Sequence, residues 1–541
     1  MKNGFYHIDL PKNEPVLQYR KDSEERRELE NSLEELKKKA VTIHPIINGK
    51  RITTKQKFKV TSPQDHSLVL AEYYHVGTEE IDLAIESTLN AKKEWAYTPW
   101  EERASIFLKA AALISGPYRS LINAATMLGQ GKNAYQAEID SACEWIDFLR
   151  FNVHFMSELF KEQPYSPDGT WNRMDYRPLD GFVFAATPFN FTAIAGNLPT
   201  APAMIGNTVV WKPATSGIYV AYFMMKILEE AGLPPGVINL VPGEGSIVGD
   251  QILTHPDLAG VHFTGSTKTF QHIWRTIGNN IEKYRSYPRI VGETGGKDFI
   301  FVHCSADTQS LATALVRGSF EYQGQKCSQA SRAYIPECLW PKLKEELITI
   351  TRDLAMGPVE DFNNFINPVI SRDAFDKITS YIDFVKNSEE GEIIQGGNYD
   401  DSVGYYIEPT IVVTTNPRFK TMTEEIFGPV LTLYIYPDDK YEETLKECDE
   451  ATGYGLTGSI FATDRNAIIL AERILEYTAG NFYINDKPTG SVVNQQPFGG
   501  TRASGTNDKA GSKMNLLRWI SARSIKETFV PPKDYHYPYM K

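Results

Sequence analysis

Residues 181–186 read Gly181-Phe182-Val183-Phe184-Ala185-Ala186, a short apolar run that recurs in kind at residues 208–211, 237–241 and 260–263. Stretches with helical periodicity separate these runs, and one of them predicts a helix from about Ser216 to Ala231 that ends at Gly232. Short buried strands that alternate with helices are typical of βαβ units in a parallel sheet. The stretch from about residue 181 to 296 therefore predicts an α/β fold.

A second α/β pattern begins after Thr294. It contains a predicted helix from about Leu311 to Tyr322, which leads into the loop that holds Cys327. A chain of 541 residues is too long for one ordinary core, so we expect two or three domains. We therefore expect the second pattern to form a domain of its own.

Two further helices are predicted nearer the N-terminus. From Ser23 to Lys39 the chain is rich in charge, and a short stripe of Leu29, Leu33 and Leu36 predicts a surface helix rather than a coiled coil. Another helix is predicted to begin after Thr78 as its N-cap. Its apolar face is formed by Ile81, Ala84, Ile85 and Leu89.

Composition excludes several classes of partner. A net charge of −12 and a pI near 5.5 argue against nucleic acid and anionic membranes. The five cysteines are spread out and form no CxxC pair, which predicts reduced thiols and no metal site. No apolar run approaches the roughly 20 residues of a membrane span, and no signal or transit peptide is visible. We expect a soluble cytoplasmic protein, or a mitochondrial matrix protein in a processed eukaryotic form.

One cysteine and one carboxylate suggest covalent catalysis. Cys327 lies in the small, polar, cationic stretch Gly324-Gln325-Lys326-Cys327-Ser328, where a thiol could become a thiolate. Glu293 precedes it by 34 residues and stands among glycines that allow close backbone approach. A sulfur nucleophile with a carboxylate base indicates a reaction through a thioester.

Other candidates are weaker when each is taken alone. The run from Gly243 to Gly249 has one residue too many for a dinucleotide fingerprint, whereas Gly265-Ser266 ends a strand where a helix start could hold a pyrophosphate. Lys212 ends a buried strand, the usual place for ligands in open α/β sheets. Asn190 offers an oxyanion donor. A solvent-facing lysine and a turn asparagine remain the alternatives for these two residues.

The order and spacing of these motifs resemble the aldehyde dehydrogenase superfamily from about Val41 onward. The motifs are Asn190, Lys212, Gly265-Ser266, Glu293, Cys327 and the run Glu424-Glu425-Ile426-Phe427-Gly428-Pro429. Within the superfamily, the chain is similar to the Δ1-pyrroline-5-carboxylate dehydrogenases. The discriminating runs are 137–140, 185–192, 323–328, 489–491, 495–500 and 502–509.

The resemblance implies a fold and a division of the chain. The fold would have a Rossmann-type NAD-binding domain, an α/β catalytic domain and a small β oligomerisation arm. The expected bounds are 1–40 for a charged helical segment, 41–160 and 178–292 for the NAD-binding domain, 293–514 for the catalytic domain, and 161–177 with 515–541 for the arm. The superfamily also makes a homodimer or higher homo-oligomer the expectation, and the C-terminal tail is either an interface arm or a frayed end.

The resemblance also implies roles for the site residues. Cys327 would attack the aldehyde, Asn190 would hold the oxyanion and Glu293 would activate the hydrolytic water. The cofactor residues would be Lys212, Gly265, Ser266, Glu425 and Phe427. The substrate residues would be Ser328, Gly490, Ser491, Phe191, Phe498, Glu144 and Lys326, with the last two as a polar pair.

These roles predict oxidation of L-glutamate γ-semialdehyde to L-glutamate with NAD, the second step of proline catabolism, with a proline dehydrogenase as a possible partner. Thr215 stands where many superfamily members carry a glutamate that repels a 2′-phosphate, so NAD is favoured by the closer resemblance only. The alternatives are another semialdehyde dehydrogenase or a non-enzymatic scaffold protein on this fold. A coenzyme A-acylating enzyme would not need Glu293, and no histidine falls in a motif typical of cysteine hydrolases.

Overall fold

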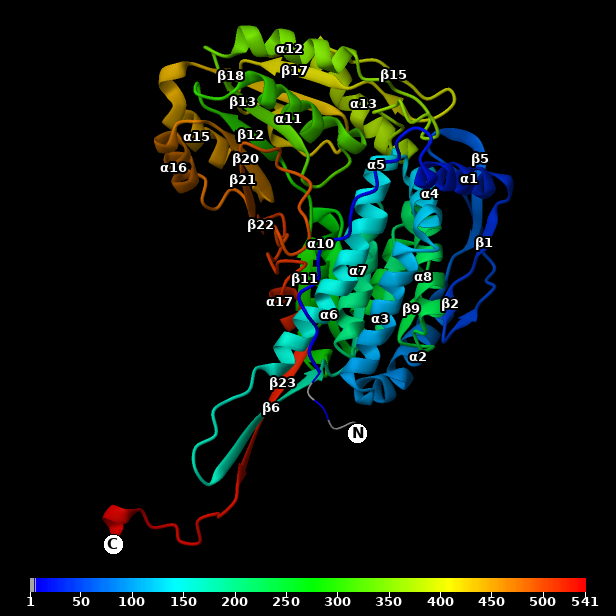
Figure 1. Ribbon diagram of the computed structural model, residues 1–541, viewed down its shortest axis with the longest axis vertical. Helices are drawn as coiled ribbons and strands as arrows, with labels where there is room; N and C mark the ends of the chain where they lie inside the picture. Colours follow the sequence, from blue (N-terminus) through cyan, green and yellow to red (C-terminus); the bar gives the residue numbers. More distant parts are fainter. Residues whose placement is uncertain (1–3, 5) are drawn as a thin grey trace.

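Two large sheets organise the computed structural model, which describes residue 4 and residues 6–541 (Figure 1). Each sheet has seven strands, and the first comes from residues 46–293 while the second comes from residues 298–484. Together they establish the α/β class predicted from the sequence.

The first sheet contains the strands predicted from the apolar runs. Its order is β11 (Arg289–Glu293), β10 (Leu258–Thr264), β7 (Phe182–Thr187), β8 (Val209–Pro213), β9 (Ile238–Leu240), β2 (Ile46–Ile47) and β3 (Lys50–Arg51). The five strands from β11 to β9 pair in parallel, which confirms the predicted βαβ pattern. The two short strands β2 and β3 add an antiparallel edge.

Helices bury both faces of this sheet. Along β7, Phe182 and Phe184 belong to one hydrophobic cluster and Val183 and Ala185 to another, as expected when alternate side chains point to opposite faces. The covering helices are α2 (Thr78–Tyr97), α3 (Trp100–Ser115), α4 (Arg119–Gln130), α6 (Trp145–Lys161), α7 (Thr192–Met204), α8 (Ile218–Ala231), α9 (Gly245–Leu253) and α10 (Thr267–Asn279).

The helix predictions differ from the structure mainly at their ends. Helix α8 ends at Gly232 with φ +101°, as predicted. Helix α1 (Glu24–Lys38) buries Leu29 and Leu33, which confirms a surface helix packed on the body. The predicted N-cap of α2 is wrong, because Gly77 is the cap residue and Thr78 is the first helical residue. The Glu80 carboxylate accepts the Gly77 N–H at 2.7 Å and thereby does the capping.

The second sheet has the order β14 (Gly391–Gln395), β17 (Thr410–Thr414), β18 (Val430–Tyr436), β13 (Ala330–Pro336), β12 (Asp298–Val302), β20 (Thr457–Phe461) and β21 (Asn481–Ile484). All neighbours are parallel except β14 and β17. The helices around it are α11 (Thr308–Phe320), α12 (Trp340–Arg352), α13 (Arg372–Lys386), α15 (Tyr441–Glu450) and α16 (Arg465–Ile474). Helix α11 stops two residues before the predicted end, since Tyr322 adopts a left-handed conformation with φ +53°.

A two-stranded ribbon leaves the body of the molecule. Strands β6 (Thr170–Pro178) and β23 (Ile520–Thr528) pair antiparallel along their whole lengths, and the C-terminal tail continues beyond their tip (Figure 1). A smaller sheet is formed by β1 (Val41–Ile43), β5 (Asp65–Tyr74) and β4 (Lys57–Ser62). It lies beside the helices of the first sheet, on the side away from the ribbon (Figure 1). None of the described helices is long and apolar enough to span a membrane.

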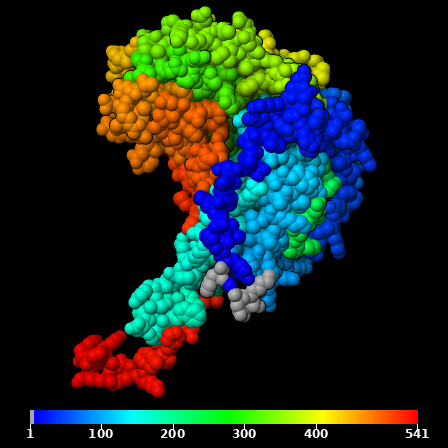
Figure 2. Space-filling model, viewed as in Figure 1, coloured from blue at the N-terminus to red at the C-terminus, as the bar shows by residue number. Residues whose placement is uncertain are grey.

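The N-terminal segment joins distant parts of the fold. It runs down the surface over the helices of the first half (Figure 2). The Asn13 amide donates to Asp147 Oδ2 on α6 at 2.8 Å and to the Val493 carbonyl at 3.0 Å. Glu14 binds Arg119 and Arg150, both at 2.5 Å. This segment therefore closes one wall of the cavity described next.

Candidate active site

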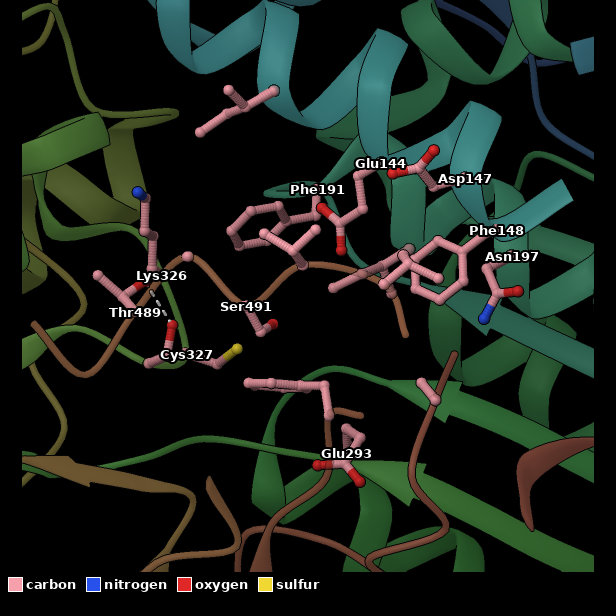
Figure 3. Close-up of a pocket in the computed structure, with 18 of the residues that line it drawn as sticks. Glu144, Asp147, Phe148, Phe191, Asn197, Glu293, Lys326, Cys327, Thr489 and Ser491 are labelled. Carbon is pink, nitrogen blue, oxygen red and sulfur yellow. Dashed lines mark hydrogen bonds between the residues drawn. The ribbon is translucent and has the colours of Figure 1, made fainter. Parts of the chain in front are cut away.

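A cavity of about 380 Å³ lies where the two halves of the chain meet. Its walls come from helix α6 and the π-helical turn η1 (Glu138–Glu144) before it, the start of α7, the Cys327 loop and residues 487–498. Figure 3 shows Cys327 and Ser491 close together on one side, with Glu144 and Asp147 on the helices opposite. Regions far apart in the sequence thus converge on one site.

The loop of Cys327 is held rigidly by its own side chains. Tyr322, Gln323 and Gly324 all have positive φ, so the backbone turns sharply after α11. The Gln323 amide donates to the carbonyls of Gly131 and Pro368, at 2.8 and 2.9 Å. These anchors fix where Cys327 enters the cavity.

The surroundings of the Cys327 thiol differ from the predicted cationic stretch. Lys326 points away from the sulfur and pairs with Glu321 at 3.1 Å (Figure 3). Burial raises the pKa of the Cys327 thiol far above its usual range, and the carboxylates of Asp298, Glu293 and Glu425 raise it further. The groups around the sulfur therefore favour the thiol over the thiolate, in contrast to the cationic surroundings suggested by the sequence.

Glu293 is the base candidate in the same cavity. It ends β11, and its Oε2 accepts the N–H of Gly500 at 2.9 Å. Burial raises the pKa of its carboxyl well above the usual range, which makes the carboxylate a stronger base than an exposed one. A Cβ at Gly505 would lie 2.9 Å from Oε2, which explains why glycine-rich backbone surrounds this carboxyl.

Asn190 is tied to the nucleophile loop. Its buried Nδ2 donates to the Gln325 carbonyl at 3.1 Å, two residues before Cys327. One N–H of an amide is used in this bond, which leaves the other available to an oxyanion. The alternative of a turn asparagine bonded to its own backbone does not describe this long-range contact.

The proposed cofactor residues fall at strand ends and a helix start. Ser266 caps α10 by accepting the Thr269 N–H at 3.2 Å, directly after Gly265. Glu425 accepts the Gly296 N–H at 3.1 Å, and burial raises the pKa of its carboxyl. Phe427 has φ +65° and packs edge-on against Phe189.

The hydrogen-bonding capacity of Lys212 shows whether these residues can bind a dinucleotide. Burial lowers the pKa of its ammonium to about 8, and that ammonium donates to the carbonyl of Pro213 at 3.2 Å. An ammonium carries three N–H donors, so two are left for ribose hydroxyls. Together with the exposed start of α10, which suits a pyrophosphate, this donor set fits NAD.

The candidate substrate-binding residues also lie on the cavity wall. Ser328 and Thr489 share a hydrogen bond of 2.7 Å between their hydroxyls. Gly490 has φ +90°, which leaves its N–H on an exposed turn beside Ser491. The cavity lining includes all seven predicted residues, namely Ser328, Gly490, Ser491, Phe191, Phe498, Glu144 and Lys326. Glu144 and Lys326 both lie on the cavity wall, and the Lys326 ammonium forms its ion pair with Glu321.

Sequence reasoning missed the charged residues behind the wall. Lys132 and Asp140 form a fully buried ion pair, and Asp140 accepts the N–H groups of Thr192 and Ala193 at 2.9 Å each. The Lys132 ammonium also lies 4.7 Å from the ring of Phe191 and 4.5 Å from that of Tyr322. The available signal was a lysine in the run Gly129-Gln130-Gly131-Lys132-Asn133.

Lys487 was also missed. Its ammonium donates to the Thr489 carbonyl at 2.8 Å and lies 3.8 Å from Glu321 Oε2. It therefore holds the turn of Gly490 and adds positive charge to the end of the cavity that holds Ser328.

Comparisons with known proteins agree with this geometry. The model of the "Aldehyde dehydrogenase family" matches residues 51–525. The mitochondrial Δ1-pyrroline-5-carboxylate dehydrogenase of Dictyostelium discoideum is 50% identical over 99% of this chain and 96% of its own. The NAD-bound crystal structure of the enzyme of that name from Mycobacterium tuberculosis is 49% identical and superposes with a TM-score of 0.97 over 100% of both chains. Proline utilization A from Bdellovibrio bacteriovorus is 28% identical, with a TM-score of 0.90 over 96% of this chain and 53% of that protein.

Proposed function

The chain belongs to the aldehyde dehydrogenase family, and from this premise we infer that it oxidises L-glutamate γ-semialdehyde to L-glutamate with NAD. The observation that carries the assignment is one cavity lined by Cys327, Glu293 and the loop of Gly490 and Ser491, which we propose binds a carboxylate. Such an enzyme acts in proline catabolism, where the semialdehyde arises by ring opening of Δ1-pyrroline-5-carboxylate.

The first step is attack of the Cys327 sulfur on the aldehyde carbon. The thiol must lose its proton, and Glu293 in the same cavity is the group that we propose takes it. The free N–H of Asn190 and the backbone N–H of Cys327 then stabilise the oxyanion of the thiohemiacetal. The contact of Asn190 with the Gln325 carbonyl supports this role, because it fixes the amide beside the loop.

Bound NAD supplies the acceptor for the hydride that leaves the thiohemiacetal carbon. We propose that Lys212 and Glu425 hold its two riboses, that Gly265 and Ser266 face the pyrophosphate, and that Phe427 packs beside the nicotinamide. The left-handed backbone at Phe427 supports a fixed ring position, since such a conformation persists only where surrounding contacts enforce it.

Hydrolysis of the Cys327 thioester completes the reaction. Glu293 first releases to solvent the proton that it took from the thiol, and it then draws a proton from water as the water oxygen attacks the acyl carbon. The carbon–sulfur bond breaks, the thiol is restored and L-glutamate leaves. The raised pKa of Glu293 suits this role, because a carboxylate poised nearer neutral pH is a stronger base.

Substrate choice rests on the far end of the cavity. We propose that Ser328, Ser491 and the N–H of Gly490 bind the substrate α-carboxylate, with Phe191 and Phe498 on either side of its aliphatic chain. Glu144 would face the substrate ammonium. Lys326 contributes positive charge behind Ser328 rather than an ion pair with Glu144.

Replacement of the nucleophile tests this function. In Cys327→Ala, NADH formation from pyrroline-5-carboxylate is expected to fall to background, while NAD binding measured by titration is retained. Full turnover in this variant would refute the mechanism. A panel of aldehydes tests the proposed carboxylate-binding residues, because equal kcat/KM for hexanal and the semialdehyde would contradict their role.

We further propose a homodimer or higher homo-oligomer, assembled through the ribbon of β6 and β23. We also propose a proline dehydrogenase as the supplier of the substrate, and the likeness to proline utilization A supports this association. We propose the cytoplasm as the compartment, with the mitochondrial matrix as the alternative that the Dictyostelium relative's name supports.

A further inference from the structure

Three neighbouring strands of the second sheet bring two thiols and a carboxylate together. Strands β12, β13 and β18 lie side by side and parallel, so their carboxyl ends meet at one edge of the sheet. Cys304, Cys338 and Asp438 each stand two residues beyond the end of one of these strands. The common register therefore directs all three side chains to one place.

The three side chains are in contact. The sulfurs of Cys304 and Cys338 lie 2.6 Å apart, and each lies within 4.8 Å of a carboxylate oxygen of Asp438. The backbone N–H of Cys338 donates to Asp438 Oδ1 at 2.9 Å, which holds the carboxylate beside the thiols. Cys338 and Asp438 are exposed and Cys304 is half-buried, so small solutes reach the cluster.

This cluster is separate from the active site. Cys327 precedes the amino end of β13, whereas Cys338 follows its carboxyl end. The seven residues of β13 span roughly 23 Å at about 3.3 Å per residue. Neither thiol lines the cavity that holds Cys327.

We propose that Cys304, Cys338 and Asp438 form a binding site for a soft divalent cation such as Zn²⁺. Two thiolates and one carboxylate are ligands that zinc takes in tetrahedral sites, with water in the fourth position. Each thiol releases its proton to solvent when the metal–sulfur bond forms. The site deviates from the sequence prediction of no metal, which considered only cysteines close together in the chain.

The geometry requires one small adjustment. With Zn–S bonds of about 2.3 Å, two sulfurs on one tetrahedral zinc lie roughly 3.8 Å apart. The thiols must therefore separate by about 1 Å, which rotation of the exposed Cys338 side chain supplies. The neighbouring His303 is engaged elsewhere, since its Nδ1 lies 2.9 Å from the Ser305 hydroxyl and its ring packs on Tyr441.

Cobalt binding tests the proposal directly. The reduced Cys327→Ala protein, which lacks the catalytic thiol as a competing ligand, is titrated anaerobically with Co²⁺. One equivalent is expected to give the near-ultraviolet band of thiolate-to-cobalt charge transfer, and Zn²⁺ is expected to displace it. Added Cys304→Ser or Cys338→Ser should abolish the band. Asp438→Asn should weaken binding about tenfold or more, whereas Asp439→Asn on the same exposed turn should not.

Other outcomes would overturn the assignment. Absence of the band, or a band that survives both cysteine substitutions, would show that these thiols do not bind the metal. Loss of two titratable thiols in air with no metal bound would identify the pair as a disulfide instead. NADH formation by Cys304→Ser and Cys338→Ser in the otherwise unchanged enzyme confirms that these variants fold.

Discussion

The protonation of the catalytic side chains is set by groups that lie far apart in the sequence. The types and order of Cys327, Glu293 and Asn190 could be read from motifs, but their protonation could not. Side chains that follow one another in sequence, such as Lys326 and Cys327, point in different directions, while carboxylates from residues 293, 298 and 425 meet around the sulfur. A pKa depends on these long-range neighbours and on burial, so it appears only in the folded chain.

The raised pKa of Glu293 leads to a prediction about the second half-reaction. In Glu293→Gln the amide cannot take a proton from water, so thioester hydrolysis is expected to slow by about 10²–10⁴-fold. Hydride transfer precedes that step. Because we also propose that Glu293 takes the thiol proton, rapid mixing of this variant should show no burst of NADH before the slow turnover.

The same experiment separates the two roles of Glu293. A burst of about one NADH per subunit followed by slow turnover would mean that another group removes the thiol proton. Glu472→Gln, at an exposed acidic residue of α16, is the control and should keep the wild-type time course. A variant of Glu293 with undiminished steady-state rate would contradict both roles.

Lys212 gives a prediction about pH. Its pKa of about 8 means that the ammonium is charged below that pH and neutral above it. The neutral amine loses a donor and its charge, so the KM for NAD should rise as the pH increases through about 8. Lys212→Met should have a higher KM at pH 7 and a flatter profile. Lys226→Met, on the exposed side of α8, should follow the wild type. An unchanged pH profile in Lys212→Met would refute the assignment.

At the scale of elements, the sequence predicted the strands and helices that are set by the local pattern of apolar residues. The strands β7 to β10 and helix α8 were found because buried strands are apolar throughout and Gly232 ends the helix. The end of α11 was missed because the left-handed turn at Tyr322 is enforced by contacts of Gln323 with residues 131 and 368. Such contacts leave no local signal in the sequence.

The start of α7 depends on a buried ion pair. Asp140 holds the first N–H groups of α7, directly after Asn190 and Phe191, while Lys132 contacts the rings of Phe191 and Tyr322. Asp140→Ala leaves the Lys132 charge buried without its partner, which is expected to cost about 3–5 kcal/mol of unfolding free energy. Thermal or urea unfolding measures this loss.

A double substitution distinguishes a positioning role from stability alone. Lys132→Met with Asp140→Ala removes both charges and should recover much of the stability. The kcat should nevertheless remain reduced, since the helix start beside Asn190 has lost its acceptor, while the KM for NAD should stay unchanged. Full recovery of kcat in the double variant would show that the pair acts only on stability.

At the scale of the whole molecule, the sequence predicted two α/β units but not how they meet. Strand β11 ends the first sheet at Glu293 and β12 begins the second at Asp298, which supports our proposed boundary between residues 292 and 293. The contact of the N-terminal segment with α6 and with residue 493 could not be foreseen. Hydrogen bonds between residues separated by 134 and 480 positions carry no sequence periodicity.

We expect the ribbon of β6 and β23 to form the interface of the proposed oligomer. A two-stranded ribbon alone is marginally stable in water, and the exposed Phe529 and Val530 follow it, at 59% and 81% of full exposure. If these side chains are buried by a second copy, Phe529→Asp with Val530→Asp should reduce the mass in light scattering toward the 61.0 kDa of one chain. Tyr477→Asp, an exposed aromatic on the body, should leave the mass unchanged. If the double variant still assembles, the oligomer forms through another surface.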